Sequence, residues 1–219
     1  MTTALDTRAL ATQMECIGIV PVLVIDRVED ARGVADALAG AGCTVLEITL
    51  RTEAALDAIA VLAEHPSLTV GAGTVLSAEQ ASEACAAGAA FLVAPGFDKA
   101  TVEFARSAAV PIVPGIATAS ELQAAWNFGL EFVKVFPAST IGGPAALRML
   151  ASICAGMRFM PTGGIGIDDL ADYLAIPAVL ACGGTWLASA SAIAERDFDG
   201  IASRAATAVA IARQARNSR

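Results

Sequence analysis

The chain has 219 residues, of which 56% are hydrophobic and only 16% are charged. This composition predicts one well-packed domain over residues 1–219, because α/β barrels of this length usually form a single unit. The formal net charge of −8 excludes a general role in binding nucleic acids or anionic membranes, since both need a basic surface. The N-terminal residues lack the layout of a signal peptide, so we expect a cytoplasmic protein.

Runs rich in Val, Ile and Leu alternate with Ala-rich amphipathic stretches along the whole chain. Before the first run, residues 4–16 predict an extra helix that caps one end of the fold, and a frayed tail is the alternative. The predicted strands are residues 18–25, 44–50, 68–75, 91–96, 110–116, 130–137, 158–164 and 178–184. A helical stretch follows each, and residues 199–216 predict the last helix. This α/β pattern favours a (β/α)8 TIM barrel over an open doubly wound sheet.

Two features of the sequence argue against a membrane span and against several kinds of catalysis. Residues 173–194 carry no charge, but Pro177 and the pair Gly183-Gly184 interrupt them, so we expect no membrane span. The five cysteines are scattered without the spacing of metal ligands, and His65 is the only histidine. We therefore expect reduced core cysteines, no metal, no cofactor and no histidine-based catalysis.

Lys134 lies in the apolar run that forms the sixth predicted strand. A central strand of this kind must desolvate the ammonium group at a cost of several kcal/mol or hold the amine neutral. A neutral lysine amine is a nucleophile that forms a Schiff base with a carbonyl substrate. The alternative is a lysine that extends to solvent at an exposed strand end.

The second predicted strand alternates, so that Glu47, Thr49 and Arg51 share one face. The opposite, apolar face should meet the outer helices, which places the polar face in the interior together with Lys134. Glu47 is then the carboxylate placed to move protons, and we assign it general acid/base catalysis. A purely structural pair between Glu47 and Arg51 is the alternative.

Working groups of a barrel lie where strands lead into loops. The third strand ends with Gly71, Gly73 and Thr74. The two glycines permit close approach of a backbone or ligand, or serve packing alone, and Thr74 offers a hydroxyl. The last two strands end in Gly-Gly turns, the first of them before a helix predicted to begin near Ile167. Bare backbone N–H groups can surround a phosphate, so we expect a phosphate site at Gly163, Gly164, Gly183, Gly184 and Thr185.

The chain resembles the pyruvate-dependent class I aldolases that cleave 2-keto-3-deoxy-6-phosphogluconate (KDPG) and 4-hydroxy-2-oxoglutarate (KHG). The resemblance extends over most of the chain and rests on the motifs LEITLRT, VGAGTVL, APG, VPGIAT, FVKVFPA, PTGGI and CGGTWL. It implies a homotrimeric (β/α)8 barrel that needs no metal and acts on a phosphorylated keto acid in the Entner-Doudoroff pathway. One departure is Thr185, where the family more often has serine, although the hydroxyl is retained.

The resemblance also implies a role for each residue of the site. Lys134 would form the Schiff base and Glu47 would accept and donate protons. The pyruvyl end would be held by Arg51, Thr74 and Thr162, while Pro95 and Phe136 would line the site.

Three other functions remain open at this point. A related branch that acts on the galactonate epimer shares VGAGTVL and VFP but typically lacks the TLRT and GGTW patterns. A phosphosugar isomerase or epimerase would need the carboxylate and the phosphate turns but no buried lysine. A non-catalytic barrel that binds phosphometabolites would need only the turns.

Overall fold

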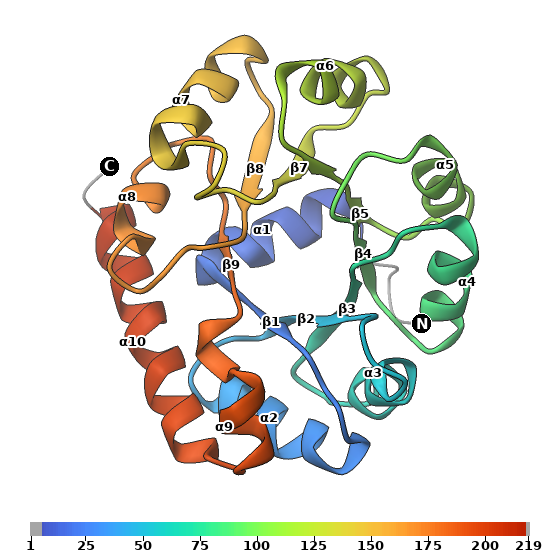
Figure 1. Ribbon diagram of the computed structural model, residues 1–219, viewed down its shortest axis with the longest axis vertical. Helices are drawn as coiled ribbons and strands as arrows, with labels where there is room; N and C mark the ends of the chain where they lie inside the picture. Colours follow the sequence, from blue (N-terminus) through green and yellow to red (C-terminus); the bar gives the residue numbers. More distant parts are fainter. Residues whose placement is uncertain (1–5, 218–219) are drawn as a thin grey trace.

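The structure, a computed structural model, describes residues 6–217. Strands run through the middle of the molecule and helices surround them (Figure 1). The strands are β1 (Ile19–Leu23), β2 (Val45–Thr49), β3 (Thr69–Gly73), β4 (Phe91–Val93), β5 (Ile112–Val113), β6 (Gly115–Ile116), β7 (Phe132–Val135), β8 (Arg158–Pro161) and β9 (Cys182–Gly184). The helices are α1 (Thr7–Ile17), α2 (Val28–Gly40), α3 (Ala55–Ala63), α4 (Ala78–Ala86), α5 (Lys99–Ser107), α6 (Ala119–Asn127), α7 (Gly143–Ile153), α8 (Leu170–Leu174), the 3-10 helix η1 (Trp186–Ala188), α9 (Ala190–Ala194) and α10 (Phe198–Asn217).

All pairings between neighbouring strands are parallel, and the strands form two curved sheets. One has the order β5-β4-β3-β2-β1-β9 and the other β6-β7-β8. The prediction of α/β architecture is confirmed, and each predicted strand range contains a strand. Residues 110–116, predicted as one strand, form both β5 and β6. The division falls at Pro114, which has no N–H to donate to a ladder.

The strands are buried on both faces, as expected for a parallel sheet covered by helices. Every residue of β1 and β2 is buried, as is every residue of β7. The fully buried apolar side chains include Phe91 and Phe159. In β2 and β7 the exceptions to this apolar core are Glu47, Thr49 and Lys134, which are polar and nevertheless buried.

Helix α1 covers the end of the fold at which the strands begin, as the sequence predicts for the extra N-terminal helix. Gln13 accepts a hydrogen bond from Oγ1 of Thr69, the first residue of β3, at 3.0 Å. Glu15 pairs with Arg158, the first residue of β8, at 2.8 Å. The start of the predicted helix, residues 4–5, lies outside the described residues. The opposite end of the strands is therefore free to carry a site.

The uncharged stretch at residues 173–194 is divided among α8, β9, η1 and α9. Between residues 6 and 217, no helix has both the length and the apolar character needed to cross a bilayer. The last helix, α10, extends from Phe198 to Asn217 and packs against α2 and α8, and the prediction of a helix over residues 199–216 is confirmed.

A buried carboxylate joins the start of α2 to the segment after α9. Asp30 is 1% exposed and accepts hydrogen bonds from Arg27 Nε at 2.7 Å and Arg196 Nε at 2.8 Å. Burial alone would raise the pKa of Asp30, but the hydrogen bonds and charges of the two arginines outweigh it and hold the pKa below its ordinary value of 3.8. The charged form therefore stabilises the folded chain.

We expect Asp30→Asn to lower the free energy of unfolding at pH 7 by about 1–2 kcal/mol, since both arginines are half exposed. A carboxyl whose pKa is lowered on folding contributes stability above its unfolded value and loses it as the pH falls through the folded value. The difference between wild type and variant should therefore shrink below about pH 4. Urea unfolding from pH 7 to pH 3 measures this. Glu103→Gln, which alters an exposed pair with Lys99, is the control, and an equal loss in both variants would contradict the expectation.

Candidate active site

A lysine and a glutamate meet inside the fold, Glu47 from the middle of β2 and Lys134 from the third position of β7. Lys134 Nζ lies 3.1 Å from Oε1 and 3.4 Å from Oε2 of Glu47. The side chains are 6% and 0% exposed, respectively. The Nζ atom also lies 5.6 Å from the centre of the Phe136 ring. An amine and a carboxylate at this distance, shielded from water, can exchange a proton directly.

The alternation of side chains along β2 explains why Glu47 lies in the interior next to Lys134. Glu47 and Thr49 point into the interior, where the Thr49 hydroxyl donates to the carbonyl of Leu23 at 3.0 Å. Glu47 pairs with Lys134, not with Arg51, so the alternative of a structural Glu47–Arg51 pair is wrong. Because the side chain of Lys134 is buried, the alternative of a solvent-exposed strand end is also wrong.

A cavity of about 170 Å³ opens beside the pair. Most of the residues predicted for the site line it, namely Glu47, Arg51, Lys134, Phe136, Thr162, Gly163, Gly164, Gly183 and Thr185. Val22 and Ile165, which the sequence does not predict for the site, also line it. No signal marks them, because β1 is apolar on both faces and Ile165 follows the glycine turn as an ordinary core residue.

Three predicted residues do not line this cavity. Thr74 follows β3, is partly exposed and has φ = 58°, a left-handed conformation that is rare for a β-branched residue. Pro95 follows β4, and its carbonyl oxygen packs against Gly115, where a Cβ atom would collide with it. Gly184 is buried next to Trp186. Their assigned roles stay predictions.

Two cationic side chains and one carboxylate line the cavity. Arg51 is exposed and makes no ion pair with any residue between 6 and 217, whereas Lys134 is paired with Glu47. The hydroxyl Oγ1 of Thr162 is buried and has no hydrogen-bond partner in the same part of the chain. A buried hydroxyl without a partner is costly, so it indicates a group that binds a polar ligand. Among the described residues, no three His, Cys, Asp or Glu side chains gather as a metal site would require.

The glycine turns also give the functional side chains room. A Cβ atom on Gly183 would collide with the side chain of Thr162, and one on Gly163 would lie 3.1 Å from the Phe136 ring. Gly163 and Gly164 have φ values of 97° and 71°, which glycine adopts without strain. Glycine at these positions therefore serves both the backbone conformation and the packing of the site.

The helix after β8 begins at Leu170 and not near Ile167 as predicted. The Asp169 carboxylate accepts a hydrogen bond from the N–H of Gly166 at 3.4 Å, so residues 166–169 form a turn in place of the first helical residues. An anion at the glycine turn would consequently rely on loop N–H groups and not on the start of a long helix.

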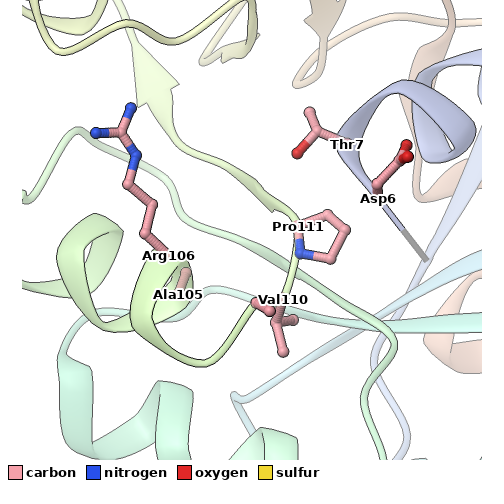
Figure 2. Close-up of a pocket in the computed structure, with 7 residues that line it drawn as sticks. Asp6, Thr7, Ala105, Arg106, Val110 and Pro111 are labelled. Carbon is pink, nitrogen blue, oxygen red and sulfur yellow. The ribbon is translucent and has the colours of Figure 1, made fainter. Parts of the chain in front are cut away.

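A larger cavity of about 310 Å³ lies at the opposite end of the strands, next to the start of α1 (Figure 2). Arg106 is its only cation among the described lining residues, and its side chain extends away from Asp6 and Thr7. The Arg106 guanidinium donates a hydrogen bond to the backbone carbonyl of Phe128 at 2.5 Å. It also lies 4.5 Å from the centre of the Phe128 ring. No lysine is among the described residues that line this cavity, so none of them can form an imine, and the smaller cavity at Lys134 is the candidate active site.

Known proteins are similar to this chain in sequence and in fold. A profile of the KDPG and KHG aldolase family matches residues 10–204. The chain belongs to this family. A 2-dehydro-3-deoxy-phosphogluconate aldolase of Treponema pallidum (strain Nichols) is 46% identical over 186 residues, or 84% of this chain and 89% of the relative.

Solved structures of KDPG aldolases are also similar. The enzyme of Zymomonas mobilis ZM4, crystallised with 3-phosphoglycerate, has a TM-score of 0.89 and 38% identity over 94% of this chain and 97% of its own. That of Legionella pneumophila has a TM-score of 0.87 and 33% identity, with 90% and 97% covered, and holds pyruvate as a covalent carbinolamine intermediate. Membership of the KDPG and KHG aldolase family favours an aldolase over the isomerase, epimerase and non-catalytic alternatives.

Proposed function

We propose that this protein is a metal-independent class I aldolase that cleaves 2-keto-3-deoxy-6-phosphogluconate to pyruvate and glyceraldehyde 3-phosphate. We propose 4-hydroxy-2-oxoglutarate, cleaved to pyruvate and glyoxylate, as a further substrate. The observation that carries the proposal is the buried contact between Lys134 and Glu47, 3.1 Å apart, in a chain that belongs to the KDPG and KHG aldolase family. The carbinolamine held by the Legionella pneumophila relative supports the same chemistry here.

The first step joins Lys134 to the substrate. The neutral Nζ attacks the C2 keto carbon, forming a carbinolamine whose hydroxyl leaves as water and gives a protonated imine. Glu47, which has taken the proton of the Lys134 ammonium, gives that proton to the keto oxygen as the amine attacks. It then accepts a proton from the attached nitrogen and donates it to the departing hydroxyl, which leaves Glu47 as a carboxylate. These transfers are within reach of a group that contacts Nζ directly.

The second step breaks the bond between C3 and C4. Glu47 removes the proton of the C4 hydroxyl, C4 becomes the aldehyde carbon of the leaving product, and the electron pair moves into the imine to form an enamine. The protonated Glu47 then delivers its proton to C3. Water hydrolyses the resulting pyruvyl imine and frees Lys134.

The remaining residues bind the two ends of the substrate. Arg51 carries a positive charge at the cavity and would hold the carboxylate, together with the hydroxyls of Thr162 and Thr74. Phe136 and Pro95 would form the apolar wall. The phosphate would be bound by Thr185 and by the backbone N–H groups of the glycine turns, Gly163, Gly164, Gly183 and Gly184.

Reductive trapping tests the function. Borohydride added with pyruvate should reduce the imine and attach the three-carbon unit to Lys134, which intact mass and peptide mapping would detect. Cleavage of the gluconate and galactonate epimers and of 4-hydroxy-2-oxoglutarate, measured side by side, would assign the substrate. Absence of both adduct and cleavage would reject the proposal, and preference for the galactonate epimer would favour the related branch.

We further propose that residues 1–219 form a single (β/α)8 barrel. Two contacts support closure: the bridges Phe159–Val179 and Thr162–Gly183 connect β8 with the segment that includes β9. Only Pro114 separates β5 from β6. The free thiols of all five cysteines support a cytoplasmic location.

We also propose that the barrel assembles as a homotrimer. Exposed apolar side chains, Leu76 at 60%, Met149 at 67% and Ile153 at 51%, support a surface that meets another subunit. Light scattering should then give three times the chain mass of 22.1 kDa. A monomer mass would reject this assembly.

A further inference from the structure

Gly73 is the last residue of β3 and lies directly beside the catalytic strand β2. It pairs with Thr49 in the register of the two strands, and its carbonyl accepts a hydrogen bond from the N–H of Leu50 at 2.8 Å. The residue is buried. Its backbone position is therefore fixed by the sheet, and it cannot move aside to make room for a side chain.

The space in which a side chain of Gly73 would lie is occupied by Glu47. An ideal Cβ atom on Gly73 would be 2.5 Å from Cγ and 2.6 Å from Cδ of Glu47, and it would overlap Oε1. Cβ atoms in proteins essentially never come within 3.0 Å of another heavy atom in this way. The overlapped oxygen is the same Oε1 that lies 3.1 Å from Lys134 Nζ.

The neighbouring glycine of the same strand has a different role. Gly71 points the same way two residues earlier, and a Cβ atom there would collide with the ring of Phe91. The sequence alone is compatible with packing or with ligand approach at both glycines. Gly71 packs against the apolar ring of Phe91, whereas Gly73 contacts Glu47, the general acid/base itself.

We infer that Gly73 is a positioning residue of the aldolase site, because the absence of its side chain allows the Glu47 carboxylate to lie against Lys134. This inference rests on the proposed function of Glu47. A methyl group at position 73 would push the carboxylate away from its contact with Nζ. The atom that the methyl group would strike, Oε1, is the one in contact with Nζ, so the carboxylate cannot keep its present position. Misplacement of a catalytic group by about 1 Å can lower a rate about 100-fold.

The test compares Gly73→Ala with Gly40→Ala, at an exposed glycine of α2 where a Cβ atom would meet nothing within 4 Å. We expect Gly73→Ala to lower kcat about 10- to 100-fold per borohydride-trapped site, with KM little changed. The pH profile of kcat should also shift. Gly40→Ala should match wild type in all three measurements.

Dividing the rate by the number of sites that borohydride traps separates misplacement of Glu47 from a loss of folded protein. A Gly73→Ala enzyme with wild-type kcat per trapped site and an unchanged pH profile would overturn the inference. Failure of wild type to form any adduct would instead reject the Schiff-base function.

A stability cycle covers the case in which Gly73→Ala does not fold alone. Glu47→Ala removes the atoms that the new methyl would strike, so Gly73→Ala should destabilise the Glu47→Ala background much less than the wild-type background. Urea unfolding of wild type, the two single variants and the double variant measures this. If Gly73→Ala fails to fold in the wild-type background, that failure counts as the larger loss of stability. Equal destabilisation in both backgrounds would overturn the inference.

Discussion

Lys134→Ala is expected to abolish cleavage, with kcat at least about 1,000-fold below wild type, because no other group can form the imine on which the reaction depends. Among residues 6–217, Lys99 is the only other lysine, and it lies on α5, 68% exposed and paired with Glu103. It cannot substitute from that position. Steady-state cleavage of 2-keto-3-deoxy-6-phosphogluconate and borohydride trapping with pyruvate measure the loss, and the adduct should disappear from position 134.

Lys134→Arg separates loss of the nucleophile from loss of charge. Alanine leaves the fully buried Glu47 without its partner, which typically costs about 3–5 kcal/mol, so inactivity could reflect unfolding. Arginine keeps a cation beside Glu47 but is never neutral and forms no imine. We expect this variant to be more stable than Lys134→Ala and equally inactive. Cleavage above about 1% of the wild-type rate in a folded variant would contradict the assigned role.

The charged residues of the site were predictable because burial makes them conspicuous. Lys134 in an apolar strand and Glu47 in an alternating strand each require a partner in the interior, and the structure supplies them to each other at 3.1 Å. The same reasoning left the partner of Glu47 open between Lys134 and Arg51. Alternation defines the face of a strand and not the distance to the neighbouring elements, so only the three-dimensional structure shows the pairing.

Apolar and backbone features were harder to predict. Nothing in the sequence marks Val22 as a residue of the cavity, because β1 is buried on both faces and shows no alternation. The division between β5 and β6 at Pro114 and the start of α8 at Leu170 depend on local hydrogen bonds. The glycine pair of β3 was visible as a motif, yet only three-dimensional packing shows that Gly73 faces Glu47 while Gly71 faces Phe91.

Glu47→Gln is expected to lower kcat for cleavage by about 100- to 10,000-fold, because the amide can accept a hydrogen bond from Lys134 but cannot take up a proton. Lys134 remains in place, so borohydride should still trap pyruvate on it, although more slowly. Exchange of the pyruvate methyl hydrogens with deuterated water should fall in parallel with cleavage, since both need a proton transfer at C3. Nuclear magnetic resonance of pyruvate measures that exchange directly.

Glu15→Gln is the matched control for Glu47→Gln. It makes the same chemical change at the opposite end of the strands, where Glu15 is partly exposed and pairs with Arg158 at 2.8 Å. Activity and exchange should both be unchanged there, which would exclude an effect of net charge alone. Retention of trapping with loss of exchange would assign proton transfer to Glu47 and imine formation to Lys134. Wild-type exchange in a folded Glu47→Gln enzyme would mean that another group moves the C3 proton, and Glu47 would then serve only to pair with the buried lysine.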